Sequence, residues 1–161
     1  MSDDAPRYPY YRYDFRGTLR LRFLDWAWLG FLARHVLFVV VLAVSSTKGQ
    51  EGSVGKVFGA LVEPWFLIAD VPAILLLTVA ANRVPKAGWG ARFVWRRGRW
   101  FVALSVALYA GLLSWLAAED ATTLDGLAWA SLAASVAIAL YAWFGRTPKD
   151  LFASFPARGM P

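Results

Sequence analysis

The sequence contains no cysteine and only one histidine, His35, and both scarcities limit its chemistry. Without a thiol, the chain has no disulfide, no thiol nucleophile and no thiolate ligand for zinc or an iron–sulfur cluster. A single histidine also excludes a multi-histidine metal site and a bis-histidine haem site built from this chain alone. We therefore expect its own side chains to bind no metal ion and no cofactor.

The usual catalytic patterns are missing as well. Ser45 is the serine nearest to His35 in the sequence, and it lies ten residues away, about 15 Å along a helix. That separation is too long for a serine–histidine pair. A glycine-rich loop that could cradle a phosphate is also absent from the sequence. We expect a protein that is not an enzyme.

Charge is scarce over most of the chain and is gathered in three clusters, at 3–25, 83–99 and 146–158. Hydrophobic residues make up 58% of the sequence and the mean hydropathy is +0.46, which is unusually apolar for a soluble domain. A helix of about 20 apolar residues crosses the hydrocarbon core of a bilayer. We therefore expect an all-α polytopic membrane protein, a bundle of four transmembrane helices. The predicted spans lie at about 23–45, 57–80, 100–118 and 124–144, with an N-terminal segment at 1–22 and a C-terminal tail at 145–161.

The basic residues predict the orientation of this bundle. Of the 17 lysines and arginines, only Arg34, Lys48 and Lys56 lie outside the N-terminal segment, the 81–99 loop and the C-terminal tail. Positive charge is enriched on the cytoplasmic side of membrane proteins. The expected topology is therefore N-in and C-in, with the N-terminal segment and the tail in the cytoplasm.

Charged side chains lie inside the first two predicted spans. Arg34 is at the middle of the first span, and Asp70 lies at a similar depth in the second. A lone arginine at the bilayer centre costs about 2.5–3.5 kcal/mol on insertion scales, and a facing carboxylate offsets much of that cost. We expect a buried Arg34–Asp70 pair that fixes the first helical hairpin. Asp25 lies near the inner surface, where we expect it to stay hydrated.

A functional interpretation of this region is also open. Glu63 precedes Asp70 by seven residues, or two helical turns, so the two carboxylates share one helix face. Pro72 would free a backbone carbonyl beside them and kink the helix. Arg34, His35, Glu63 and Asp70 thus form a candidate intramembrane charge cluster for a proton relay or an anion site.

The last two predicted spans carry small residues at every fourth position. These are Ala103, Ala107 and Gly111 in the third span, and Ser131, Ser135 and Ala139 in the fourth. Small side chains at this spacing let two helices approach closely, and serine can form a hydrogen bond across the interface. We expect these small residues to serve close helix packing in the second hairpin.

The loop at 81–99 contains four clustered arginines, Arg92, Arg96, Arg97 and Arg99. These arginines mainly indicate the cytoplasmic side of the membrane. They are also a candidate binding site for anionic lipid head groups. Because no nucleic-acid-binding motif accompanies them, we expect nucleic acid not to be a partner.

The stretch YDFRGTLRLRFLDWAWLGFLARHVL at 13–37 combines a Y-D-x-x-G-x-L entry with a span that contains Arg34 and His35. Together with the second span bearing Pro72 and the RVP…WRRGRW loop, it resembles the YfeZ-like proteins, a bacterial inner-membrane family of unknown function. The resemblance covers about the first hundred residues. It implies a multi-pass protein of the bacterial inner membrane, and it singles out Arg34 and His35 without assigning them a chemistry.

Two functions fit these observations. The first is a non-enzymatic accessory or scaffold component of a membrane assembly, in contact with the lipid bilayer and with other membrane proteins or a second copy of itself. The alternative is a small transporter or proton-coupled subunit that uses Arg34, His35, Glu63 and Asp70.

Overall fold

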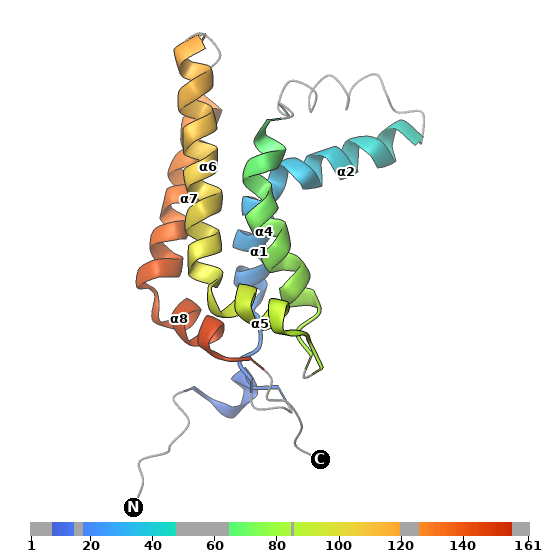
Figure 1. Cartoon of the computed structure of the whole chain (residues 1–161), viewed down its shortest axis with the longest axis vertical. Coiled ribbons are helices and arrows are strands. Elements are labelled where there is room, and N and C mark those ends of the chain that lie inside the picture. The colour runs from blue at the N-terminus through green and yellow to red at the C-terminus, as the bar shows by residue number, and fades with distance from the viewer. Residues whose placement is uncertain (1–7, 15–17, 48–64, 85, 120–125, 156–161) are drawn as a thin grey trace, which may run out of the picture.

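The computed structural model of the chain describes residues 8–14, 18–47, 65–84, 86–119 and 126–155 (Figure 1). The α-helices in these ranges are α1 (Phe23–Leu32), α2 (Arg34–Thr47), α4 (Phe66–Ala81), α5 (Trp89–Arg96), α6 (Gly98–Glu119), α7 (Gly126–Phe144) and α8 (Arg146–Ala153). A short 3-10 helix, η1 (Tyr10–Arg12), precedes them. Apart from an isolated bridge between Tyr13 and Leu19, these ranges contain no β-structure. The prediction of an all-helical fold is confirmed for this part of the chain.

The body of the described structure is formed by α1, α4, α6 and α7 (Figure 1). α4 packs against both α1 and α6, and α7 packs against α6. The main core contains buried apolar side chains from several of these helices, including Leu29, Leu76 and Val102. A smaller cluster joins Phe66 of α4 to Tyr109 of α6. Burial of these apolar faces is what aligns the helices.

Within the described ranges, two helices, α6 and α7, are each long and apolar enough to cross a membrane. They correspond to the predicted spans at 100–118 and 124–144, of which residues 124 and 125 lie outside the described ranges. The predicted span at 57–80 is described only from residue 65 onward, where α4 is a shorter apolar helix of 16 residues.

The span predicted at 23–45 is not one continuous helix. It is broken into α1 and α2, which are bent by 83° relative to each other, and the pair counts as a third candidate span only when its two parts are taken together. In Figure 1, α1 runs beside α4, whereas α2 leaves the bundle sideways. The expectation of a straight first span is therefore corrected.

The expected stripe of small residues on α6 does not form the helix interface. Ala107 and Gly111 are exposed, and α6 instead buries a face that includes Val102 and Val106. Valine removes more apolar surface from its surroundings than alanine or glycine, so this face packs more favourably. On α7, Ser135 is buried, as expected of an interface residue.

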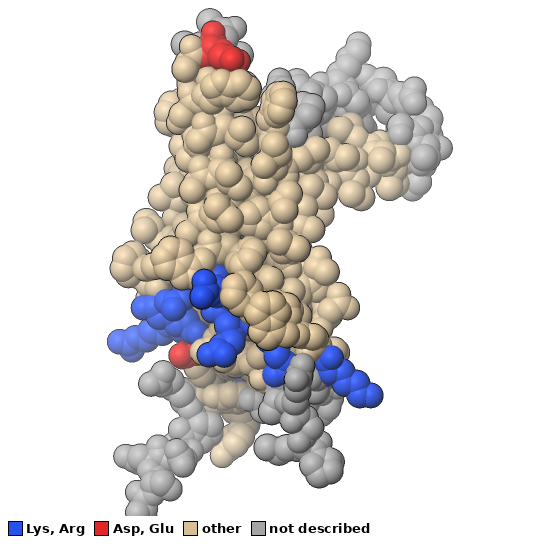
Figure 2. All heavy atoms as spheres, viewed as in Figure 1, with Lys and Arg blue, Asp and Glu red and all other residues tan. Residues whose placement is uncertain are grey.

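One end of the bundle is closed by α5, α8 and the N-terminal residues, and basic side chains gather there (Figure 2). Trp95 of α5 is fully buried, and its indole N–H lies 3.0 Å from the carbonyl oxygens of both Leu151 and Ser154. The hydroxyl of Tyr8 donates a hydrogen bond of 2.7 Å to Asp150. These contacts attach α5 and the N-terminal segment to α8.

Arg83 connects three segments at this end. Its guanidinium donates to the carbonyl oxygen of Leu19 at 3.1 Å and to the hydroxyl of Ser154 at 3.3 Å, and it lies 4.9 Å from the ring centroid of Trp95. Burial lowers the pKa of Arg83, and the carboxylate of Asp14 acts in the opposite direction. Because arginine stays protonated at neutral pH, Arg83 is a charged residue that holds these three segments together.

Candidate functional site

The candidate site lies where α1 gives way to α2. The N–H of Ala33 is shared between the carbonyl oxygens of Leu29, at 3.2 Å, and Gly30, at 3.1 Å, so the last turn of α1 is tightened. Ala33 has φ −99° and ψ 22°, and α2 begins at the next residue in a new direction. A helix start is thereby created inside the bundle, and its first N–H groups lack partners within the helix.

Asp70 of α4 provides a partner for this helix start. Its Oδ2 accepts a hydrogen bond of 3.0 Å from the N–H of Val36, in the first turn of α2. In an uninterrupted helix that N–H would bond to the carbonyl of Leu32, four residues earlier. A carboxylate at a helix N-terminus also interacts favourably with the helix dipole. Asp70 therefore caps α2 from a neighbouring helix and stabilises the break.

The other oxygen of Asp70 contacts His35. The Nδ1 of His35 lies 2.9 Å from Oδ1 of Asp70, and the two residues are only 5% and 1% exposed. A hydrogen bond at this distance requires one proton, carried either by Nδ1 or by the carboxyl group. The contact is thus a buried acid–base pair at the point where the helix changes direction.

Two aromatic rings enclose the imidazole of His35. The ring of Phe66 is stacked on it, with centroids 5.1 Å apart and planes inclined by 18°. The ring of Tyr109 lies 5.6 Å away, and it is 5.2 Å from Phe66. Because these rings keep water away, the polar contact between His35 and Asp70 is stronger than it would be at the surface.

Arg34 does not pair with Asp70, and the predicted ion pair is corrected accordingly. Within the described ranges, the salt-bridge partner of Asp70 is His35. The physical reason is the geometry of the new helix start. Neighbouring residues on a helix point about 100° apart, so when His35 faces α4, Arg34 is directed elsewhere.

The surroundings of Arg34 are mostly aromatic. Its Nη1 donates to the carbonyl oxygen of Phe31 at 3.1 Å and lies 3.5 Å from the hydroxyl oxygen of Ser135 on α7. The guanidinium carbon is 4.6 Å from the ring centroid of Phe31 and 4.4 Å from that of Tyr109. The Nη2 atom is buried and has no hydrogen-bond partner among the described residues. Cation–π contacts therefore stabilise this cation, with only part of its hydrogen-bonding capacity used.

The remaining predicted carboxylates do not join this site. Glu63 lies outside the described residues. Asp25 is only 2% exposed and is therefore a buried residue, which corrects the expectation that it stays in contact with water. Its Oδ2 accepts a hydrogen bond of 2.8 Å from the N–H of Arg22, and Oδ1 lies 3.4 Å from the indole nitrogen of Trp28. Asp25 is buried because it satisfies polar groups at the start of α1.

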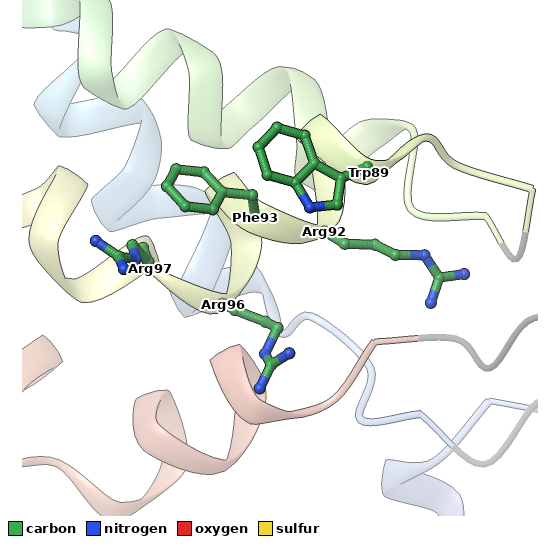
Figure 3. Close-up of a pocket in the computed structure, with 5 residues that line it drawn as sticks. All are labelled: Trp89, Arg92, Phe93, Arg96 and Arg97. Atoms are coloured by element: carbon green, nitrogen blue, oxygen red, sulfur yellow. The ribbon is translucent and has the colours of Figure 1, made fainter.

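The four arginines proposed for lipid binding separate into two groups. Arg92, Arg96 and Arg97 line one pocket on α5, together with Trp89 and Phe93 (Figure 3). Arg99 does not line this pocket. Its guanidinium lies 5.7 Å from the ring centroid of Trp143 on α7.

Sequence reasoning missed the aromatic residues and the serine that complete the buried site. Phe66 and Tyr109 lie in apolar helices, where an aromatic residue carries no specific signal of contact with a histidine. The hydroxyl of Ser105 on α6 donates a hydrogen bond of 2.6 Å to the carbonyl oxygen of Ala69, next to Asp70. A tyrosine and a serine on one face of a predicted membrane helix were the available clues, since both polar groups need partners when buried.

These features define an all-helical protein with helices of membrane-spanning length and a buried acid–base pair at a helix break. The chain belongs to the family described as Protein of unknown function (DUF2919), whose sequence model matches residues 8–154. Comparison with curated proteins and with solved structures found no match. The family match spans both sides of the helix break, and the relation to the YfeZ-like proteins stays a prediction.

Proposed function

We propose that this protein is a multi-pass protein of the bacterial inner membrane, with both termini in the cytoplasm, and that it serves as a non-enzymatic accessory or scaffold component of a membrane assembly. The observation that carries this proposal is the position of α2, an apolar helix set at 83° to α1 and stabilised there by Asp70. The partner is another membrane protein or a second copy of this chain.

The surface of α2 favours such a role. Leu37, Val40 and Val44 are 47%, 52% and 51% exposed, although they belong to an apolar helix. The start of α2 is held by two polar contacts to α4, so its direction is set by the protein rather than by the surrounding lipid. A helix fixed in this way presents a defined apolar face to a neighbouring membrane helix.

Charge placement and helix length support the membrane position and the orientation. α6 has 22 residues and is therefore about 33 Å long, enough to cross a bilayer core. Basic side chains gather at the end formed by α5 and α8, whereas Glu119 lies at the opposite end of α6 (Figure 2). Since cytoplasmic segments are enriched in Lys and Arg, the basic end is assigned to the cytoplasm.

A photo-reactive amino acid at Val40 tests the accessory role. In cells, we expect Val40 on α2 to give a protein adduct of defined mass, identified by mass spectrometry as another membrane protein or as this chain. The same probe at Leu140, which is 53% exposed on α7, serves as the matched control for general contact with lipid. Adducts with lipid alone at both positions would overturn the accessory role.

Reporter fusions test the orientation separately. A reporter fused after Pro161 is expected to be active only if it is of a cytoplasmic type. A reporter inserted within residues 48–56 is expected to be active only if it is of a periplasmic type. A periplasmic position for the C-terminus would contradict the proposed topology without affecting the accessory role.

The buried pair of His35 and Asp70 favours one alternative, a small transporter or proton-coupled subunit. Ionisable groups at a broken membrane helix occur in transporters, where the helix ends help to bind ions or substrates. Proteoliposomes loaded with a pH-sensitive dye would test it. Proton flux in the wild type that disappears in a folded Asp70→Asn variant supports transport, and the absence of flux in the wild type across pH 5–8 excludes proton movement by the isolated chain.

A further inference from the structure

The outward face of α5 carries both aromatic and basic side chains. Trp89, Phe93 and Arg97 recur at every fourth residue, and Arg92 and Arg96 lie beside them, so all five share one side of the helix. They line a pocket of about 470 Å³ at the basic end of the molecule (Figure 3). A pocket of this composition is unusual for a surface that faces only water.

The inward face of α5 fixes the direction of this pocket. Trp95 is fully buried, and its N–H is bound by carbonyl oxygens at the end of α8. Arg83 covers the ring of Trp95. With one side of α5 anchored in this way, the side that bears the pocket is turned away from the core.

An aromatic ladder forms one wall of the pocket. The rings of Trp89 and Phe93 are stacked, with centroids 5.3 Å apart and planes inclined by 28°. The guanidinium carbon of Arg97 lies 4.9 Å from the Phe93 ring centroid, which extends the ladder by one residue. Trp89 nevertheless remains 75% exposed. Exposed tryptophan beside basic residues is typical of the interface between membrane and water.

Two arginines of the basic wall, Arg96 and Arg97, are accessible to an external anion. Neither Arg96 nor Arg97 forms a salt bridge within the described ranges, and both are exposed. Guanidinium groups are well suited to phosphate because their N–H groups can donate two parallel hydrogen bonds. The positive charges of the adjacent Arg96 and Arg97 repel each other, and a bound anion would relieve that repulsion.

We propose that this pocket binds the phosphate-bearing head group of an anionic phospholipid from the leaflet that borders the basic end. Arg92, Arg96 and Arg97 provide positive charge and hydrogen-bond donors for the phosphate. Trp89 and Phe93 contact the glycerol region and the first carbons of the acyl chains. The proposal rests on the membrane position argued above, but not on the accessory role. Arg99 lies outside the pocket. The proposal therefore concerns a defined set of arginines and not a general attraction of lipid to all basic residues at this end.

The apolar wall favours a lipid over free phosphate. Phosphate ion is fully hydrated and gains nothing from contact with indole and phenyl rings, whereas a phospholipid brings apolar surface directly below its phosphate. The apolar helix α6 follows α5 directly in the chain and packs against it, so apolar surface for the acyl chains lies close to the pocket. The two sources of phosphate are therefore separable by experiment.

Native mass spectrometry of the purified full-length protein tests the lipid site. Phosphatidylglycerol and phosphatidylcholine are titrated into the protein in detergent, and we expect the anionic lipid to bind at least about tenfold more tightly. The double substitution Arg96→Gln with Arg97→Gln is expected to weaken the binding of phosphatidylglycerol about tenfold. The substitutions Arg99→Gln with Arg146→Gln remove the same charge at the same end, outside the pocket, and serve as the matched control with an expected change below about threefold.

The outcomes distinguish this site from the membrane position itself. A protein that fractionates with membranes yet shows no preference for phosphatidylglycerol overturns the lipid site alone. An equal loss in the pocket and control variants would also overturn it, because the effect would then be general charge attraction. Displacement of the lipid by inorganic phosphate at millimolar concentration would identify a phosphate site in place of a lipid site. A Trp89→Leu variant is expected to weaken lipid binding while leaving the net charge unchanged.

Discussion

The Nδ1 of His35 and the Oδ1 of Asp70 lie 2.9 Å apart and join the first turn of α2 to the second turn of α4. Because the same carboxylate also accepts the N–H of Val36, Asp70 stabilises both a side chain and a helix start. The contact explains how a chain can break an apolar helix inside its core without leaving those polar groups unpaired.

Asp70→Ala is expected to destabilise this helix break. The substitution leaves the buried N–H of Val36 and the imidazole of His35 without their partner, at a cost of about 3–5 kcal/mol in the free energy of unfolding. Spin labels at Leu24 and Val44, both exposed, measure the geometry by pulsed electron paramagnetic resonance. We expect a short and narrow distance distribution in the wild type and a broader one, shifted toward the about 30 Å of a straight helix, in Asp70→Ala.

Asp70→Asn is the matched control for this experiment. The amide oxygen can still accept the N–H of Val36, so the label distance is expected to stay near its wild-type value. A label distance in Asp70→Ala that equals the wild type would show that Asp70 does not hold the break.

A double-mutant cycle is expected to find coupling between His35 and Asp70. With leucine as the replacement, each single substitution leaves a buried polar group unpaired, whereas the double substitution removes both groups. We expect an interaction free energy of about 1–3 kcal/mol from thermal or chemical unfolding in detergent. The cycle between Arg34 and Asp70 is the comparison, and its coupling is expected to be smaller. Equal coupling in the two cycles would argue against the pairing described above.

Gly98→Ala is expected to disturb the junction of α5 and α6. A Cβ atom at this position would overlap the ring of Phe152, which is itself buried. Overpacking of this kind costs about 1–3 kcal/mol, so the midpoint of thermal unfolding should fall. Gly111→Ala is the control, because nothing lies within 4 Å of a Cβ at Gly111 and the substitution favours the helix. Destabilisation of equal size at both positions would contradict the close contact with Phe152.

Trp95→Phe is expected to weaken the attachment of α5 to α8 at the basic end of the molecule. The substitution keeps an aromatic ring in the core but removes the N–H that lies 3.0 Å from two carbonyl oxygens. The expected loss is about 1–3 kcal/mol, because the carbonyl groups are left partly unsatisfied. Hydrogen exchange of the α8 amides would report it as faster exchange. Trp89→Phe, at an exposed position, should leave this exchange unchanged.

The amino-acid sequence determined the helical class of this protein and the approximate positions of α6 and α7. Those properties depend on the length and hydropathy of local segments, and a run of about 20 apolar residues has few other solutions. The sequence also drew attention to Arg34, His35 and Asp70, because charged residues are rare in apolar runs.

Tertiary structure decided which of these residues meet. Arg34 and His35 lie at similar depths in the sequence pattern, so either could have paired with Asp70. The change of direction at Ala33 turns His35, and not Arg34, toward Asp70. The same turn sent Arg34 toward Phe31 and Tyr109, a neighbour 75 positions away in the sequence. A hydropathy pattern records how apolar a segment is but not where its direction changes. The break arises because a carboxylate on another helix replaces a backbone carbonyl as hydrogen-bond acceptor, and that exchange exists only once α4 is packed beside α1.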